Sequence, residues 1–348
     1  IVADTPGHEQ YTRNMATGAS TADLAVILID ARKGVLTQTK RHSYIVSLLG
    51  IKHVVVAVNK MDLIDFDQLQ YQRIQKDYLA FSHQLGLKDI NFIPVSALKG
   101  ENVYQKSSLM PWYDGPSLME VLENINVEVD AEDKPFRMPV QWVNRPSLDF
   151  RGYSGTVASG ELSPGDQVTI IPSGQQSTVK QIYTYDGDLD VAGSGESITV
   201  VLDDQIDISR GDLICKSQGR AEKSDQFAAH ILWMHDEPLL PERSYSLMIG
   251  TKEVNAVITD LRYIVNVNTL EHNAGRTLKL NEVGYCNLST DVEIGFDPYK
   301  VCREMGGFIL VDRFTNNTVG VGMIEHSLRR ASNISWSATD VNKEIRST

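Results

Sequence analysis

Four residues, Asn59 to Asp62, read Asn-Lys-Met-Asp directly after the apolar run HVVVAV (53–58). Ligands of α/β proteins bind at the carboxyl ends of parallel strands, so these side chains lie where recognition takes place. Asp62 can accept two hydrogen bonds from the N1 and N2 hydrogens of guanine, which adenine cannot supply, and such a bidentate contact discriminates bases by roughly 1–3 kcal/mol. Lys60 can lay its stem over the base plane, and Asn59 can tie neighbouring loops together. Taken alone, the four residues would also fit an Asx turn that caps the next helix.

A second loop, SALKG (96–100), ends the next apolar run along the chain. Its Ser-Ala backbone can offer an N–H group to the guanine O6, and the same segment can hold Asp62. Ser96, Ala97 and Leu98 are therefore the second group of predicted base-binding residues. Two loops at neighbouring strand ends, both suited to one base, favour guanine recognition over an isolated Asx turn.

The predicted phosphate side is the loop DTPGHE (4–9), which ends the apolar residues IVA. Asp4, Pro6 and Gly7 are expected to face the nucleotide. Asp4 can reach Mg²⁺ through a water, and Gly7 lets its backbone N–H approach a γ-phosphate closely because no Cβ intervenes. His8 follows where GTPases place the group that orients the attacking water, although an exposed loop histidine is the alternative. The order phosphate, base, base predicts a site for GTP or GDP with Mg²⁺.

One expected part of such a site has no counterpart in the sequence. The phosphate-binding pattern G-x-x-x-x-G-K-[ST] does not occur, and GTK (250–252) lacks the first glycine and lies in a β-rich region. A GTPase needs that loop and its lysine to hold the β-phosphate and Mg²⁺. We therefore expect the first strand, the phosphate-binding loop, the first helix and the switch I threonine to lie upstream of residue 1. A degenerate domain that binds no nucleotide is the alternative.

Alternating apolar runs and helical patterns must position these loops. The runs at 23–31, 53–60 and 91–97 are nearly continuously apolar, as in strands that are covered on both faces. Stretches with helical patterns fall at 37–50, where Thr37 could be the cap, and at 65–86 and 117–125. Alternation of strand and helix predicts a parallel α/β sheet.

After the acidic stretch NVEVDAEDKP (126–135) the pattern changes to short Val/Ile/Thr-rich segments between Gly, Pro and Asp residues. Such segments are typical of antiparallel β-barrels or sandwiches. The expected fold is multidomain α/β + β, a GTPase domain incomplete at its N-terminus followed by two β-barrels. The predicted boundaries are 1–127 for the GTP-binding domain, 128–135 for a linker, 136–222 for the first barrel, and 223–348 for the second barrel with its tail.

Composition narrows the function classes. The chain has 348 residues and a formal net charge of −12. This negative charge disfavours extensive nucleic-acid binding, because proteins that neutralise a phosphate backbone usually carry an excess of basic residues. No apolar run is long enough to cross a bilayer, the start lacks the basic region of a signal peptide, and cytoplasm is the expected location. Cys215, Cys286 and Cys302 lie far apart, so we expect buried free thiols rather than a metal or redox site.

The motifs D-x-P-G-H, N-K-M-D and S-A-L, followed by two barrels, resemble translation-factor-type GTPases of the elongation factor Tu/1A group. Thr5 and the pair Glu9-Gln10 depart from the DCPGHADY-like loop of true elongation factors. Longer stretches are similar more specifically to the GTPase subunit of bacterial ATP sulfurylase, the large subunit of sulfate adenylyltransferase. They are residues 4–51, MPVQWVNRPSLDFRGYSGTVASGELSPGDQV, HDEPLLPERSYSLMIG and GGFILVDRFTNNTVGVGMI.

The resemblance implies a role in sulfate assimilation. It implies a heterodimer or higher assembly with a smaller catalytic subunit of the PP-loop type. That partner joins sulfate to ATP and forms adenosine 5′-phosphosulfate and pyrophosphate, a step to which GTP hydrolysis is coupled. The tail NISWSATDVNKEIRST resembles the segment that precedes an adenylylsulfate kinase domain in bifunctional relatives, but no kinase activity is expected of this chain. The alternative function is a translational GTPase that delivers aminoacyl-tRNA.

Overall fold

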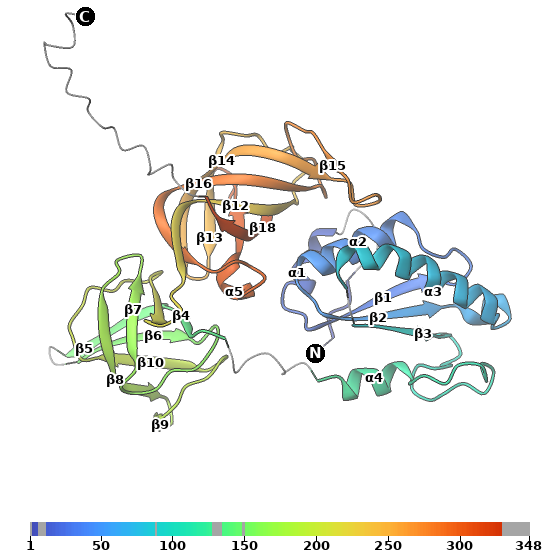
Figure 1. The fold of residues 1–348 in the computed structure, drawn as a ribbon, viewed down its shortest axis with the longest axis horizontal. Helices are drawn as coiled ribbons and strands as arrows, with labels where there is room; N and C mark the ends of the chain where they lie inside the picture. The colour runs from blue at the N-terminus through green and yellow to red at the C-terminus, as the bar shows by residue number, and fades with distance from the viewer. Residues whose placement is uncertain (1, 6–11, 88, 127–133, 148–149, 329–348) are drawn as a thin grey trace, which may run out of the picture.

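The computed structural model describes residues 2–5, 12–87, 89–126, 134–147 and 150–328. Its N-terminal part contains a parallel three-stranded sheet in the order β1–β2–β3 (Figure 1). These strands correspond to the three apolar runs, so the predicted parallel α/β sheet is confirmed. Residues 54–58 of β2 are all buried, as expected for a central strand covered on both faces. The strands are β1 (Leu24–Asp30), β2 (His53–Asn59) and β3 (Asp89–Pro94).

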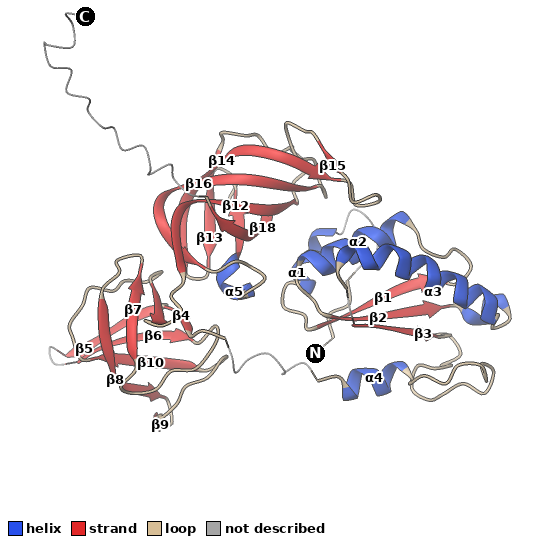
Figure 2. Ribbon diagram, in the orientation of Figure 1, coloured by secondary structure: helices blue, strands red, loops and turns tan. Residues whose placement is uncertain are grey.

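Helices cover both faces of this sheet (Figure 2). The first three helices lie on one face, and the fourth lies on the other. Ile45 and Ile74, from the second and third helices, share a core with β1 and β2, whereas Val121 of the fourth packs with Val55 and Ile93. The helices are α1 (Thr12–Ala19), α2 (Thr37–Leu48), α3 (Gln68–Ser82) and α4 (Leu118–Asn124), with the short 3₁₀ helices η2 (Met61–Ile64) and η3 (His83–Leu85).

Local sequence sets where these helices begin and end. Asp67 caps α3 by accepting a backbone N–H with its side chain, and Ser117 opens α4 in a capping box. Gly50 follows α2 with φ 69°, a left-handed conformation that glycine adopts without a steric penalty. The expectation that Thr37 caps α2 is wrong, because Leu36 occupies the N-cap position and makes no side-chain hydrogen bond.

The second part is an antiparallel sheet in the order β4–β11–β7–β8–β10–β6–β5, with β9 beside β8. The sheet curls so that β4 meets the segment after β6: Arg137 N–H donates to the Ser159 carbonyl at 2.9 Å, and Ala158 N–H donates to the Arg137 carbonyl at 2.8 Å. Its strands are β4 (Arg137–Pro139), β5 (Trp142–Ser147), β6 (Phe150–Thr156), β7 (Gln167–Ile171), β8 (Gln176–Thr184), β9 (Gly187–Asp188), β10 (Ser197–Leu202) and β11 (Leu213–Lys216).

The third part is a closed barrel. Six strands follow the order β13–β17–β18–β12–β16–β14, pairing of β13 with β14 completes the ring, and β15 pairs with β14 outside it. Phe227, Phe296 and Phe308 pack at the centre of its core. The chain thus forms a parallel-sheet domain followed in sequence by two barrel-like parts, which confirms the predicted multidomain α/β + β fold class. The strands are β12 (Glu222–Trp233), β13 (Ser244–Ile249), β14 (Lys252–Val265), β15 (His272–Asn273), β16 (Val283–Phe296), β17 (Gly307–Val311) and β18 (Thr318–Ser327), with α5 (Arg303–Gly306) before β17.

A buried ion pair joins the two β parts. Arg137 of β4 donates to both carboxylate oxygens of Asp297, at 2.6 and 2.9 Å, and both residues are almost fully buried. The same guanidinium also donates to the Phe136 and Gly219 carbonyls. Ile171 and Leu213 pack beside the pair with Met305. The contact between the two β parts therefore has a buried interior, which contains an ion pair and apolar side chains.

A second contact joins the sheet domain to the third part. The Arg303 guanidinium donates to the carbonyls of Ser20 and Ala22, just after α1, at 3.1 to 3.3 Å. The Tyr299 hydroxyl donates to the Leu49 carbonyl, just after α2, at 3.2 Å. All of these bonds end on backbone carbonyls of the segments that follow α1 and α2.

Two expectations about composition can be compared with the structure. The cysteines 215, 286 and 302 are buried free thiols, as predicted, and burial raises the pKa of each thiol. Within the described residues, no helix is long and apolar enough to cross a membrane.

Candidate functional site

The predicted base-binding loops leave the same edge of the parallel sheet. Asp30 at the end of β1 pairs in register with Asn59 at the end of β2. The next strand continues the line, since Val95 N–H donates to the Val58 carbonyl at 2.8 Å and Met61 N–H donates to the Val95 carbonyl at 3.2 Å. The carboxyl ends of all three strands therefore carry their side chains into one region.

Asn59 joins two of these loops. Its side-chain oxygen accepts hydrogen bonds from the Lys60 N–H at 2.7 Å and from the Ala97 N–H at 3.0 Å. Lys60 has φ 67°, a left-handed conformation that is uncommon for a residue with a Cβ. Asn59 thus holds a sharp change of chain direction in the first loop and the start of the second loop at the same time, which is the tying role predicted from the sequence.

Asp62 and Ser96 form the most direct contact between the loops. The Ser96 hydroxyl donates to Asp62 Oδ1 at 2.6 Å, and Ser96 is fully buried. The Ser96 hydroxyl also accepts the Lys99 N–H at 3.3 Å, and two backbone hydrogen bonds of 3.1 Å between Ser96 and Glu101 close the second loop. Asp62 is only half-buried, so the hydrogen bond from the buried Ser96 leaves part of this residue exposed to solvent.

One acidic residue at this edge was not singled out by the sequence analysis. Asp30 Oδ2 accepts a hydrogen bond from Lys60 Nζ at 3.0 Å, and Arg32 donates to both oxygens of the same carboxylate. These cations, Arg32 first, hold the pKa of Asp30 well below its usual range. The hydrogen bond and the charge of Asp30 raise the pKa of Arg32, and the charge of Asp62 adds a smaller contribution in the same direction. The available signal was the position of Asp30, an acidic residue near the end of the apolar run at 23–31, which precedes the run at 53–60 that contains Asn59.

The predicted phosphate loop is described only in part. Asp4 is exposed, and Thr5 lies against Gly18 of α1, where a Cβ would come within 3.0 Å of the Thr5 methyl group. Pro6, Gly7 and His8 lie outside the described residues, so their predicted roles remain predictions. Across the part of the chain that the structure describes, no three His, Cys, Asp or Glu side chains gather as a metal site.

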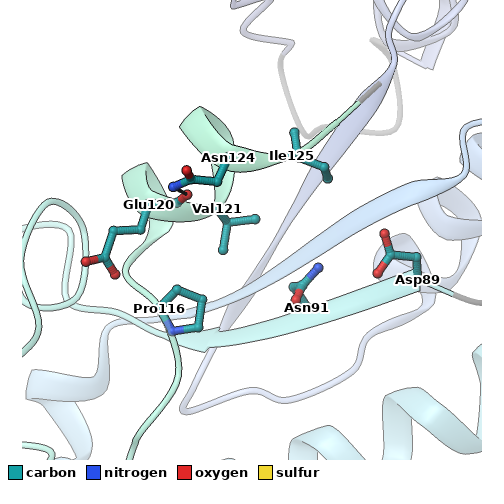
Figure 3. A pocket seen from close by; sticks show the side chains of 7 residues that line it. All are labelled: Asp89, Asn91, Pro116, Glu120, Val121, Asn124 and Ile125. Atoms are coloured by element: carbon teal, nitrogen blue, oxygen red, sulfur yellow. Dashed lines mark hydrogen bonds between the residues drawn. The ribbon is translucent and has the colours of Figure 1, made fainter. Parts of the chain in front are cut away.

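A shallow pocket of about 460 Å³ lies elsewhere, between β3 and α4 (Figure 3). Its two carboxylates already have partners: Asp89 is hydrogen-bonded to the His53 ring, and Glu120 accepts the Ser117 N–H of the capping box. Asp89 also begins β3, so this pocket is at the opposite end of that strand from Ser96. We therefore assign it no ligand. Its lining consists of Asp89, Asn91, Pro116, Glu120, Val121, Asn124 and Ile125.

Of the predicted base-binding residues, the structure brings five into mutual contact or adjacency. Asn59, Lys60, Asp62, Ser96 and Ala97 are connected by the bonds above. Leu98 follows them in the second loop and is 88% exposed, and its predicted role in base binding stays a prediction.

Family models match two regions of the chain. Residues 1–128 match the elongation factor Tu GTP binding domain, and residues 226–325 match the GTP-eEF1A C-terminal domain-like family. A solved structure of sup35 complexed with GMPPNP is similar over 90% of this chain and 80% of its own, with a TM-score of 0.54 and 24% identity. That likeness supports the fold: a parallel-sheet domain followed by two barrels.

Curated relatives are similar over almost the whole chain. The "Bifunctional enzyme NodQ" of Rhizobium sp. (strain N33) is 56% identical over 99% of the chain and 54% of its own length. The chain thus spans about half the length of this relative, as it does for the NodQ of Azospirillum brasilense at 55% identity. "Sulfate adenylyltransferase subunit 1" of Laribacter hongkongensis is 54% identical over 93% of the chain and 68% of its own length. The chain belongs to the sulfate adenylyltransferase subunit 1 family.

Proposed function

We propose that this chain is the GTP-binding and GTP-hydrolysing part of a sulfate adenylyltransferase. One observation carries the proposal: the Asp62 carboxylate is held by a buried serine next to two loops that Asn59 ties together. The match of residues 1–128 to the elongation factor Tu GTP binding domain family and the membership in the sulfate adenylyltransferase subunit 1 family support the same function. GTP hydrolysis would be coupled to the formation of adenosine 5′-phosphosulfate and pyrophosphate from ATP and sulfate by a smaller catalytic subunit of the PP-loop type.

Base recognition follows from the supported carboxylate. Ser96 occupies one lone pair of Asp62, and the remaining lone pairs accept the N1 and N2 hydrogens of guanine. The sequence predicts that a backbone N–H of Ser96 or Ala97 meets the guanine O6. The Ser96 N–H donates to the Glu101 carbonyl at 3.1 Å, and the Ala97 N–H donates to the Asn59 side chain at 3.0 Å. The O6 atom would therefore share one of these donors or take the neighbouring amide of Leu98. Xanthine carries a carbonyl where guanine has its amino group, so an asparagine at position 62 should favour xanthine nucleotides.

The phosphate side of the proposal depends on Asp4 and the loop after it. Carboxylate oxygens suit Mg²⁺, which keeps several waters and binds through few protein ligands, and the exposed Asp4 fits such a water-mediated contact. Bound Mg²⁺ supplies neutralisation of the phosphate charge. Gly7 would bring its backbone N–H to the γ-phosphate, and His8 would orient the attacking water.

Coupling would use the contact between the sheet domain and the third part. α1 directly follows the predicted γ-phosphate loop, and the Arg303 guanidinium holds the carbonyls of Ser20 and Ala22 behind that helix. A cavity of about 390 Å³ borders this contact. A shift of α1 on hydrolysis would break or move these bonds, and the barrels would change their position relative to the nucleotide domain.

The base-reading assignment has a direct test in nucleotide preference. The natural full-length protein and its Asp62→Asn variant are titrated with GDP and with xanthosine diphosphate. We expect at least about 100-fold weaker GDP binding in the variant and a gain for the xanthine nucleotide, because two hydrogen bonds to a charged group are lost. Unaltered preference would remove Asp62 from base reading.

The overall function is tested with the small subunit present. Sulfate-dependent pyrophosphate release from ATP is measured with and without GTP, for wild type, His8→Ala and Arg303→Ala. GTP stimulation should vanish for His8→Ala together with GTPase activity. Arg303→Ala should keep GTPase activity but lose stimulation, since that residue bonds to carbonyls after α1 and belongs to none of the predicted nucleotide loops. Copurification of tRNA without a second subunit would instead favour the translational alternative.

A further inference from the structure

The Asp30 carboxylate, at the end of β1, receives more hydrogen bonds than a surface carboxylate usually does. Arg32 donates from its backbone N–H and from Nε to Oδ1, each at 3.0 Å, and from its outer nitrogen to Oδ2 at 2.7 Å. Lys60 Nζ adds a bond to Oδ2 at 3.0 Å. The Asp30 side chain is only 17% exposed, although both cations are nearly half exposed.

Asp30 accepts a hydrogen bond from Lys60, the residue whose methylene stem is predicted to lie over the plane of the guanine base. Lys60 belongs to the N-K-M-D loop, and its backbone is already fixed by Asn59 and by its left-handed conformation. The Asp30 contact fixes the other end of the same side chain. Lys60 is therefore held at its backbone by Asn59 and at its ammonium group by Asp30, and the backbones of Asn59 and Asp30 are paired across β1 and β2.

We propose that Asp30 is a positioning residue of the guanine site, which acts through Lys60 and is itself held by Arg32. The inference rests on the proposed function, because it assigns Asp30 to the same nucleotide site. Asp30 touches no base in this role. It orders the lysine stem in advance, so that less rotamer freedom is lost when the base binds.

The expected size of the effect follows from two opposing terms. Immobilising a long side chain on binding weakens affinity roughly 2- to 10-fold, and ordering it in advance removes that loss. An exposed ion pair on its own contributes little. Loss of Asp30 should therefore weaken GDP binding about 3- to 10-fold without changing base preference, because Asp62 and Ser96 stay in place.

A double-mutant cycle tests whether Asp30 acts through Lys60. A fluorescent GDP analogue is titrated into the natural full-length protein and into the variants Asp30→Ala, Lys60→Ala and the double variant. If the inference is right, the double variant binds no more than about 2-fold weaker than Lys60→Ala, because Asp30 has nothing left to position. Asp30→Asn should keep part of the affinity, since its amide oxygen still accepts a hydrogen bond. Independent effects that multiply in the double variant would overturn the inference.

Asp89→Ala is the matched control, because that aspartate begins β3 at the other end of the strand and pairs with His53. It should bind the GDP analogue as wild type does. Thermal melts of all variants verify that they are folded. If wild type binds and Asp62→Asn changes base preference while Asp30→Ala binds normally, the inference fails and the proposed function stands. If wild type binds no guanine nucleotide, both fail.

Discussion

Replacing Ser96 by alanine is the sharpest perturbation of the proposed base site. The substitution removes one hydroxyl, which donates to Asp62 Oδ1 at 2.6 Å and accepts the Lys99 N–H at 3.3 Å. The backbone bonds between Ser96 and Glu101 do not involve the side chain, so the second loop should stay closed. Asp62 keeps its charge and its place in the chain but loses its fixed orientation.

The magnitude follows from what the hydroxyl does for the carboxylate. A hydrogen bond to a charged group contributes about 1.5–3 kcal/mol when both partners are shielded from water. Asp62 is half-buried, so water replaces part of the lost hydrogen bond. The bond also exists both with and without a bound base, so most of its free energy cancels between the two states. The binding free energy keeps only the benefit of holding the carboxylate in the orientation that accepts guanine. We therefore expect a loss of about 1 kcal/mol, or roughly 5-fold weaker GDP binding.

Calorimetric titration of the natural full-length protein with GDP measures this loss. Ser47→Ala is the matched control, since its hydroxyl donates to the Leu85 carbonyl at 2.8 Å, a contact that involves no residue of the base site. The control should bind GDP as wild type does. Base preference should persist in Ser96→Ala because Asp62 still reads the base. A folded Ser96→Ala protein with wild-type affinity would refute the claim that Ser96 supports the base-reading carboxylate.

Two further predictions concern stability. Arg137→Met should lower the free energy of unfolding by about 3–5 kcal/mol in urea titrations, because it leaves the buried Asp297 charge unpaired, and adding Asp297→Leu should restore most of the loss; equal stability of single and double variants would contradict this. Burial lowers the pKa of His230 below 6.5, so the unfolded chain binds more protons and the folded protein should lose stability as the pH falls through that value. His230→Gln should reduce this loss between pH about 7.5 and about 5.5, and an unchanged pH profile would exclude His230 as its source.

The sequence was sufficient for the parallel sheet because its strands are nearly continuous apolar runs, which few other structures accommodate. It was less exact for the helix starts. α3 begins at Gln68 rather than near 65, since Asp65 and Phe66 have φ values of 51° and 55° and cannot continue a right-handed helix. α2 begins without a side-chain cap at Leu36, so its start depends on tertiary packing rather than on a local signal.

The residues of the proposed base site could be selected from the sequence by type and position, and their contacts could be predicted only in part. Asn59 ends β2, Asp62 and Ser96 lie just after β2 and β3, and their grouping depends only on the parallel order of those strands. The role inferred for Asp30 depends on the register that places it opposite Asn59, and this register comes from the pairing of two strands rather than from the residues next to Asp30 in the sequence. The Arg137–Asp297 pair joins residues 160 positions apart, so only the folded chain could show it.

The two contacts between the parts of the molecule both combine polar bonds with apolar packing but differ in their charges, and this difference bears on how coupling could work. Between the β parts, a bidentate ion pair is buried among apolar side chains, so separating them would expose two charges and an apolar cluster together. Between the sheet domain and the third part, Arg303 and Tyr299 donate to carbonyls that follow α1 and α2, and Met234 and Met323 belong to the same buried apolar cluster as Met15. A movement that starts at the nucleotide should reach this second contact first, because α1 follows the predicted γ-phosphate loop, and the buried charge pair should keep the two β parts moving as one body.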